Sequence, residues 1–163
     1  MTLYAGLALE LPPVSLTAPD TAETQRALGA AEIEAQQTTW LARSSREEDC
    51  LYFAVRASGR LVGQIMLHDI DAGRRVALVG YHIFRGRDRR QGYGTAALRL
   101  LCDYALGELH LRRLVAITGR ENIASQALAL TAGFRCTGTA REGPHLLTYE
   151  LTAERRQNRS PIE

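Results

Sequence analysis

The segment RRQGYGTAALRLL, residues 89–101, places two arginines and two glycines directly before an apolar, helix-forming run. Glycine tolerates backbone conformations that turn several N–H groups to one side, and the first turn of a helix leaves its own N–H groups without partners. These groups, the positive end of the helix dipole and the charges of Arg89 and Arg90 favour a bound anion. The segment therefore predicts an anion site at the start of a helix, with a solvated basic loop as the alternative.

Periodicity and turn residues around this segment predict the order of the other elements. Three β-rich runs, the first two joined by Ser58-Gly59, are typical of an antiparallel meander. Gly63 and Gly80 within these runs indicate a bulge or a close approach to the backbone. We expect strands near the N-terminus and at 51–57, 60–69, 74–84, 112–118, 134–140 and 145–152, and helices at about 21–43, from Thr95 to near Gly107, and at 122–133.

This order predicts an α/β (α+β) fold, with a mixed, mostly antiparallel central sheet of about seven strands flanked by helices. With 163 residues the chain has the length of one domain, which we expect to span residues 1–152. Residues 153–163 are polar and are expected to form a frayed C-terminal tail.

Composition narrows the class of protein. The chain is 45% hydrophobic and 23% charged, and it has no apolar run near the roughly 18 residues of a membrane helix. The N-terminus has no secretion-signal pattern, so we expect a soluble, cytoplasmic protein without a membrane partner. Three scattered cysteines, Cys50, Cys102 and Cys136, argue against a disulfide framework and against a zinc site. We expect no bound metal.

The charged residues also exclude some kinds of chemistry. The net charge is only +2, which is too balanced to predict a nucleic-acid partner. All 20 basic residues are arginine, so lysine Schiff-base chemistry and a Walker-type phosphate loop are excluded. Any phosphate would be held by arginine side chains and backbone N–H groups.

The segment GYGTAA formally fits the G-x-G-x-x-A pattern of dinucleotide-binding folds. That pattern should directly follow the first buried strand of a parallel sheet. Here an arginine-rich loop, residues 85–91, separates it from an antiparallel meander. The context argues against a dinucleotide fold.

Two spaced motifs instead resemble those of the GNAT superfamily of acyl-coenzyme A dependent N-acetyltransferases. The family's Arg/Gln-x-x-Gly-x-Gly/Ala motif matches Arg89-Arg90-Gln91-Gly92-Tyr93-Gly94, and its Asn-x-x-Ser segment ending in Gly-Phe matches residues 122–134. The chain is most similar to the branch that acetylates N-terminal alanine or serine of ribosomal proteins, whose members also modify small amines. The resemblance covers roughly residues 3–152 and implies a GNAT-like fold.

The resemblance implies acetyl-coenzyme A as cosubstrate. The backbone N–H groups of residues 90–95 and the hydroxyl of Thr95 would hold the pyrophosphate. His82, Ile83 and Phe84 would pair with the pantetheine arm, although the spacing from Gly80 to Arg89 is one residue longer than usual. The expected coenzyme-binding residues are His82, Ile83, Phe84, Arg89, Arg90, Gln91, Gly92, Tyr93, Gly94, Thr95, Asn122 and Ser125.

Acetyl transfer needs a neutral amine, a polarised carbonyl and a way to stabilise the departing thiolate. Many relatives have a tyrosine four residues before the Gly-Phe pair, where this sequence has Ala129. Ser125 is the remaining candidate acid, with a backbone-satisfied helix serine as the alternative. Asn122 is a candidate coenzyme ligand or simply a helix cap.

The general base is less clear from the sequence, because Leu78 stands where relatives of this branch often have a glutamate. His82 on the strand and Asp69 beside His68 are the candidate bases, against packing and turn-forming roles. Glu142 and His145, in a later hairpin, are further possibilities, as is deprotonation through water. Trp40 and Tyr52 would line an acceptor pocket or pack in the core.

The sequence thus predicts an enzyme that transfers acetyl directly to a primary amine, either a peptide N-terminus or a small molecule. No covalent enzyme intermediate is expected. A coenzyme A-binding sensor without efficient catalysis is the first alternative, because Leu78 and Ala129 replace catalytic groups. An arginine-rich nucleic-acid adaptor is the second. The resemblance also leaves a homodimer open.

Overall fold

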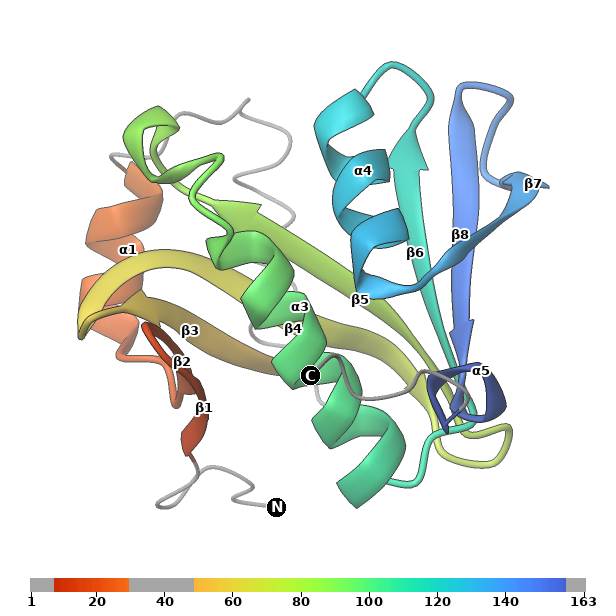
Figure 1. The fold of residues 1–163 in the computed structure, drawn as a ribbon, viewed down its shortest axis with the longest axis horizontal. Coiled ribbons are helices and arrows are strands. Elements are labelled where there is room, and N and C mark those ends of the chain that lie inside the picture. Colours follow the sequence, from red (N-terminus) through yellow and green to blue (C-terminus); the bar gives the residue numbers. More distant parts are fainter. Residues whose placement is uncertain (1–7, 30–48, 158–163) are drawn as a thin grey trace.

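A computed structural model describes residues 8–29 and 49–157, which form a twisted sheet with helices on both faces (Figure 1). In this part of the chain the sheet has eight strands in the order β1-β2-β3-β4-β5-β6-β8-β7. Neighbouring strands are antiparallel except β5 and β6, which are parallel. The mixed, mostly antiparallel sheet expected from the sequence is confirmed.

The strands are β1 (Ala8–Leu11), β2 (Val14–Thr17), β3 (Leu51–Ala57), β4 (Arg60–Asp71), β5 (Val76–Ile83), β6 (Arg113–Gly119), β7 (Arg135–Thr139) and β8 (Leu146–Thr152). The helices are α1 (Thr21–Gly29), α3 (Tyr93–Asp103), α4 (Ile123–Ala132) and α5 (Ala153–Gln157), with a 3-10 turn η1 (Gly86–Asp88) and a π-helical turn η2 (Tyr104–Glu108). The part of the 21–43 helix prediction beyond Gly29 lies outside the described residues. No helix of the described segments is both long and apolar enough to cross a bilayer.

The secondary structure near the N-terminus and near the C-terminus differs from the sequence expectation. At the N-terminus, where one strand was expected, β1 and β2 form a hairpin joined at Pro12-Pro13. Proline cannot donate to a sheet ladder, so the pair ends one strand and the next begins after it. At the C-terminus, the first residues of the expected frayed tail form α5, and Arg156 makes a 2.8 Å ion pair with Asp103.

The meander β3-β4-β5 follows the sequence prediction closely. Ser58 and Gly59 both have positive φ, 49° and 82°, which is the backbone of a tight primed hairpin turn. The β3–β4 register shifts between Val55 and Arg56, opposite Val62, which confirms the bulge expected beside Gly63. A side chain at Gly63 would collide with the His82 carbonyl oxygen, so the glycine is required there.

The parallel pairing of β5 with β6 is short, and the two strands separate beyond it. The two strands pair only from Val76 beside Arg113 to Leu78 beside Val115. Beyond these three pairs β6 pairs with β8 through Gly119, while β5 stays with β4. Figure 1 shows the two strands diverging upward, with α4 beside the open end of β6.

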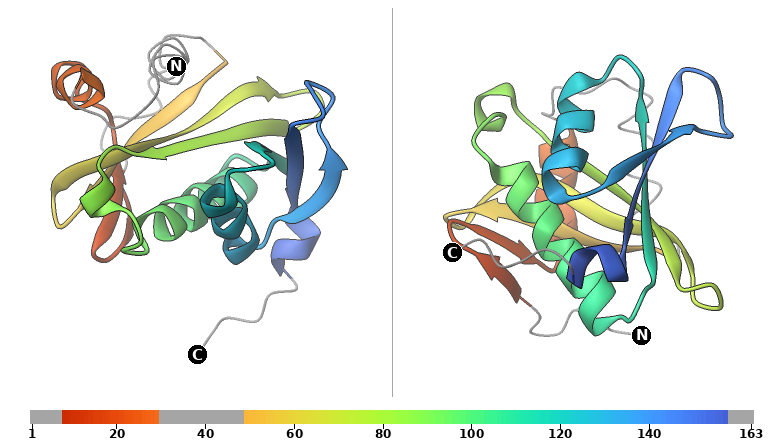
Figure 2. Two further views of the ribbon diagram at one scale, coloured as in Figure 1. Left: turned by 90° about the horizontal axis from the view of Figure 1, so that it is seen from above. Right: turned by 45° about the vertical axis from the view of Figure 1, so that its right-hand side comes forward.

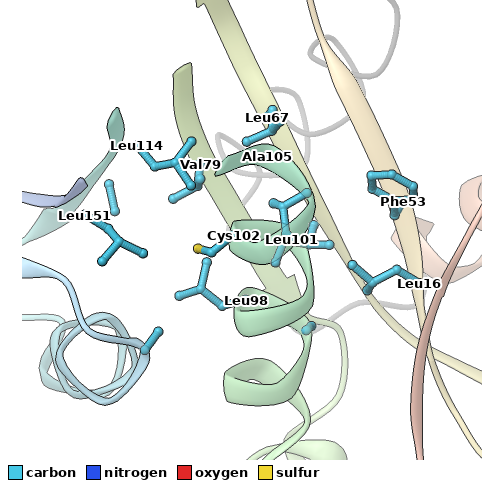
Figure 3. Packing of buried hydrophobic residues seen from close by; sticks show 14 of the residues in the cluster. Leu16, Phe53, Leu67, Val79, Leu98, Leu101, Cys102, Ala105, Leu114 and Leu151 are labelled. Atoms are coloured by element: carbon cyan, nitrogen blue, oxygen red, sulfur yellow. The ribbon is translucent and has the colours of Figure 1, made fainter. Parts of the chain in front are cut away.

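The main core lies between the sheet and α3. Ala97, Leu98, Leu101 and Cys102 of α3 are buried against strand side chains that include Phe53 and Leu114 (Figure 3). These helix positions follow the 3.6-residue period, so one face of α3 is apolar. The view from above in Figure 2 shows α1 on the opposite face of the sheet from α3 and α4. A smaller buried pair, Met66 and Phe84, lies on the α1 face.

Helix α4 has the two ends expected from its sequence. The Asn122 side chain accepts a hydrogen bond from the Ser125 N–H at 3.1 Å, which satisfies one N–H of the first turn. Gly133 ends the helix with φ 104°, a left-handed conformation that glycine adopts without strain. Phe134 is buried directly after it, so the chain turns back into the core.

Leu101→Ala should destabilise the fold, because Leu101 is 0% exposed at the centre of the α3 face. We expect a loss of about 2–5 kcal/mol in the free energy of unfolding, from lost burial and the cavity left behind. Chemical denaturation measures this loss. Leu130→Ala on α4 is the matched control, since Leu130 is 53% exposed and its truncation should change stability little. Equal losses in the two variants would contradict the core described above.

Candidate functional site

The divergence of β5 and β6 opens a cleft in the middle of the sheet. Two of its sides are the separated strands, and the first turn of α4 and the start of β8 close it further. Figures 1 and 2 show α4 beside β6 at the end where β5 and β6 have diverged. The residues that line the cleft are His68, Leu78, Val79, Gly80, Tyr81, His82, Ala116, Ile117, Thr118, Gly119, Asn122, Ser125 and Leu146.

The loop from β5 to α3 is held in place by a buried carboxylate. Asp88 is 4% exposed, and both of its oxygens accept hydrogen bonds from the Arg60 guanidinium of β4, at 2.9 and 3.1 Å. These hydrogen bonds hold the pKa of Asp88 below its ordinary value. A two-point contact of this kind fixes orientation as well as distance, so the loop is tied to the sheet at Asp88.

The loop then presents a run of backbone N–H groups at the start of α3. Arg90 and Gly92 both have positive φ, 61° and 81°, so the chain reverses direction just before the helix. The Ala96 N–H donates to the Gly92 carbonyl, but within the described chain the N–H groups of residues 90–95 donate to no acceptor. Consecutive amides of this kind at a helix N-terminus form an anion-binding surface.

The two glycines of the motif have different roles. A Cβ on Gly92 would meet nothing within 4 Å, so this position faces open space and is constrained mainly by its positive φ. A Cβ on Gly94 would lie 2.6 Å from Leu128 Cδ1 of α4. Gly92 therefore allows the left-handed turn into α3, whereas Gly94 allows α3 and α4 to pack closely.

The open edge of β5 differs from the expectation for residues 82–84. The Phe84 N–H donates to the Val62 carbonyl at 2.9 Å. By the alternation of an antiparallel ladder, the backbone groups of Phe84 and His82 face β4, and those of Tyr81 and Ile83 face the opening. Of His82, Ile83 and Phe84, only Ile83 turns its backbone groups toward the opening, which narrows the contacts that the resemblance left open.

Arg89 is also placed differently from the expectation. Its Nε and Nη2 atoms each donate to the Ile83 carbonyl at 3.2 Å, so the guanidinium closes the loop back onto the end of β5. The sequence suggested that it adds charge directly at the anion site. In the structure its guanidinium instead binds the Ile83 carbonyl and thereby fixes the loop to the open edge of β5.

Ser125 lies in the cleft, on the first turn of α4. Its hydroxyl oxygen is 3.0 Å from the hydroxyl of Tyr81 on β5, and the Tyr81 hydroxyl also lies 3.2 Å from the Ser125 carbonyl oxygen, to which it donates. The sequence identified Ser125 and Asn122, and the structure brings both to the cleft wall. Sequence reasoning missed Tyr81. Its only signal was a tyrosine two residues past Val79 in a mainly apolar strand.

His82 lines the cleft but is a weak base. Burial first, and then the charge of Arg89, lower the pKa of His82 to about 4, so its ring is neutral at pH 7. Its Nε2 atom is buried and has no hydrogen-bond partner in the described chain. The side-chain amide of Gln64, its cross-strand neighbour, is likewise buried without a described partner.

Asp69 does not line the cleft itself but contacts His68, which does. Its Oδ2 atom lies 2.6 Å from His68 Nδ1, and its backbone has a φ of 49°, which is uncommon for a residue with a side chain. The Asp69 side chain is 65% exposed, while His68 lines the cleft. Glu142 and His145, the further candidates, are not among the lining residues. Trp40 lies outside the described residues, and Tyr52 packs against Met66 and Phe84.

Comparison with known families agrees with this arrangement. Residues 10–135 match the model of the acetyltransferase (GNAT) domain. The chain belongs to the GNAT family.

Individual relatives of this GNAT chain include proteins named for ribosomal targets. YdaF of Bacillus subtilis, a candidate ribosomal N-acetyltransferase, is 39% identical over 85 residues, which is 52% of this chain and 46% of YdaF. The chain thus spans about half the length of that relative. A candidate ribosomal-protein-serine acetyltransferase from Vibrio cholerae has the same fold, with a TM-score of 0.74 at 22% identity over 92% of this chain and 99% of that one.

A second solved structure, RimJ of Mycobacterium smegmatis in complex with CoA-disulfide, superposes with a TM-score of 0.70 at 22% identity. The match covers 94% of this chain and 89% of RimJ. At this identity the likeness establishes the fold. The GNAT fold expected from the sequence is therefore confirmed over nearly the whole chain.

Gly92→Val and Gly94→Val should fail in different ways. Valine at Gly92 strains a left-handed backbone within the run of open amides, so coenzyme A affinity should fall at least about tenfold while the protein stays folded. Valine at Gly94 collides with Leu128 and should lower the melting temperature. Calorimetric titration and thermal denaturation of both variants separate the two effects. Full coenzyme affinity in Gly92→Val would contradict the anion site.

Asp88→Asn should loosen the loop and remove a source of acid sensitivity. Because the folded-state pKa of Asp88 is lowered, its contribution to stability is present above its unfolded pKa of about 3.9 and is lost as pH falls through the lower folded value. The variant should therefore lose less stability on acidification below about pH 4 than the wild type. Denaturant unfolding across this range measures the difference. Asp71→Asn, whose carboxylate is 50% exposed, is the control and should behave like wild type.

Proposed function

We propose that this chain transfers the acetyl group of acetyl-coenzyme A directly to a primary amine, and that the preferred acceptor is the α-amine of a protein N-terminus. Its membership of the GNAT family and the names of its relatives support this activity. The observation that carries the proposal is the run of unpartnered amides at residues 90–95, at the end of the sheet where β5 and β6 part.

The residues present fit a coenzyme A molecule. The amides of residues 90–95 suit the pyrophosphate, and the Thr95 hydroxyl lies on the first turn of the same helix. Along the open edge of β5, Tyr81 offers its backbone N–H and carbonyl groups and Ile83 its N–H for the amides of the pantetheine arm, since the Ile83 carbonyl accepts from Arg89. RimJ, which shares the fold, is known with a coenzyme A disulfide. When bound, acetyl-coenzyme A supplies an acetyl group activated as a thioester.

The absence of a carboxylate from the described lining of the cleft supports an α-amine as acceptor. The titratable side chains among its described lining residues are His68, Tyr81 and His82, without any carboxylate. His82 is a weak base because its pKa lies near 4. At pH 7 roughly a tenth of α-amines are already neutral, against well under about a thousandth of lysine-like amines. A cleft whose described lining has no carboxylate is better matched to the α-amine, with release of its proton to water.

The chain's residues then have few chemical tasks. The amine nitrogen forms a bond to the acetyl carbon as the carbon–sulfur bond breaks, and the electron pair of that bond passes to sulfur. Backbone amides at the strand divergence polarise the carbonyl oxygen, and the Ser125 hydroxyl donates to the sulfur. The amine proton leaves through water, and a proton from water completes the thiol.

A coenzyme A-binding sensor is the second candidate function. The presence of Leu78 in the cleft and of buried Ala129 on α4, where relatives have catalytic groups, favours it. Such a protein would keep the coenzyme site and lack turnover, so binding and turnover must be measured separately.

Thiol release from acetyl-coenzyme A tests the proposal. We expect turnover with peptides that have free N-terminal serine or alanine, much slower turnover with polyamines or aminoglycosides, and none with the same peptides blocked at the N-terminus. Ser125→Ala should lower kcat by about a hundredfold with little change in coenzyme affinity, because the donor acts as charge develops. Thr131→Ala is the control, since Thr131 is on the outer part of α4 and donates to the Ala127 carbonyl.

Three results would count against the proposal. Failure to bind coenzyme A at millimolar concentration would remove both the enzyme and the sensor. Binding without thiol release for any amine would favour the sensor. Faster turnover of polyamines than of peptides would overturn the α-amine preference while leaving the acetyltransferase activity.

A further inference from the structure

Tyr81 joins the two walls of the cleft through Ser125. Its ring packs at the edge of the main core, and its hydroxyl crosses from β5 to the first turn of α4. The hydroxyl has two partners on one residue, the Ser125 carbonyl at 3.2 Å and the Ser125 Oγ at 3.0 Å. The 44-residue separation of the two side chains in sequence shows that the contact is made by the tertiary fold.

The Tyr81 hydroxyl is protonated at neutral pH. Burial raises the pKa of Tyr81 above its ordinary value of 10.0, and the hydrogen bond with Ser125 opposes this only in part. The phenol is therefore a donor rather than a base. Ala129 is buried on α4 and has only a methyl group at the position where many relatives have a tyrosine. In this chain the phenol that lies near Ser125 is that of Tyr81 on β5, on the other side of the cleft.

We propose that Tyr81 is a positioning residue that orients the Ser125 hydroxyl and strengthens it as a hydrogen-bond donor to the departing sulfur. This inference rests on the proposed acetyltransferase function. The inference means that a tyrosine on β5 assists protonation of the departing sulfur, whereas many relatives have a tyrosine on the helix that corresponds to α4.

Because the Tyr81 hydroxyl lies near both the carbonyl and the hydroxyl of Ser125, its proton can turn from one oxygen to the other while all heavy atoms stay in place. At rest, Tyr81 donates to the Ser125 carbonyl and the Ser125 hydroxyl donates to the phenol oxygen. As electron density passes to the sulfur, the Ser125 proton turns toward it and the Tyr81 proton turns from the carbonyl to Oγ. No O–H bond is broken in either residue. A donor that itself accepts a hydrogen bond is stronger, because hydrogen bonds in a chain polarise one another.

A purely structural role for the phenol is the competing explanation, and Tyr149 provides a matched control. Tyr149 on β8 is also buried, and its hydroxyl also reaches α4, lying 3.5 Å from Gln126 Oε1. Tyr149 does not line the cleft. Tyr81→Phe and Tyr149→Phe thus each remove a contact from a strand to α4, and only the first of these contacts involves Ser125.

The experiment compares wild type, Tyr81→Phe, Ser125→Ala, the double variant and Tyr149→Phe. The first readout is steady-state kinetics with the preferred amine. The second is calorimetric coenzyme A affinity. The third is the pKa of the bound coenzyme A thiol, followed by the ultraviolet absorbance of the thiolate in the complex. The third readout does not depend on turnover, and a loss of packing alone should leave it unchanged.

We expect Tyr81→Phe to lower kcat about tenfold with KM for acetyl-coenzyme A nearly unchanged, and to raise the pKa of the bound thiol by about one unit. The double variant should be no slower than Ser125→Ala, since Tyr81 acts through Ser125. Tyr149→Phe should match wild type in all three readouts.

Two results would overturn the inference while the proposed function stands. One is an active wild type with a Tyr81→Phe variant that matches Tyr149→Phe. The other is a Tyr81→Phe effect that persists in full in the Ser125→Ala background. If the wild type itself releases no thiol, the proposed function fails first, and an unchanged thiol pKa in Tyr81→Phe would then also reject the positioning role.

Discussion

The loss of pairing between β5 and β6 after three residue pairs is the constraint on which the site depends. A continuous parallel ladder would satisfy the backbone groups of both strands and leave no opening. On its other edge β6 pairs with β8 over all seven residues, and the first turn of α4 lies beside the edge that faces β5. On the free edge of β5 the sheet leaves the backbone groups of Tyr81 and Ile83 unused, and Arg89 then takes up the Ile83 carbonyl.

The loop that follows β5 is shaped by contacts that leave its amides open. Asp88 is held by Arg60, and Arg89 is held by the Ile83 carbonyl, so two charged side chains of the arginine-rich loop are used to fix the backbone. Gly94 allows α4 to approach α3, and Gly92 turns the chain into the helix. The anion-binding capacity then resides in the N–H groups of residues 90–95, which are held rigidly by their neighbours.

The chemistry available in the cleft is that of weak acids and weak bases. Tyr81 is a protonated phenol, Ser125 is a hydroxyl, and His82 is neutral with a low pKa. Such a set can orient a thioester and donate hydrogen bonds, but it provides little driving force for removing a proton from a strongly basic amine. The proposed preference for an α-amine, which is partly neutral at physiological pH, rests on this set of groups.

The sequence by itself determined the parts that depend on neighbouring residues. The hairpin at Ser58-Gly59, the bulge beside Gly63, the cap and stop of α4 and the motif at the start of α3 all follow from local backbone preferences. Only the tertiary structure decided which motif glycine faces the opening, where Arg89 points, which residues of β5 have open backbone edges, and that Tyr81 meets Ser125. Each of these depends on how two distant elements pack, as Gly94 does on Leu128 and Tyr81 on α4, and local preferences carry no information about such distances.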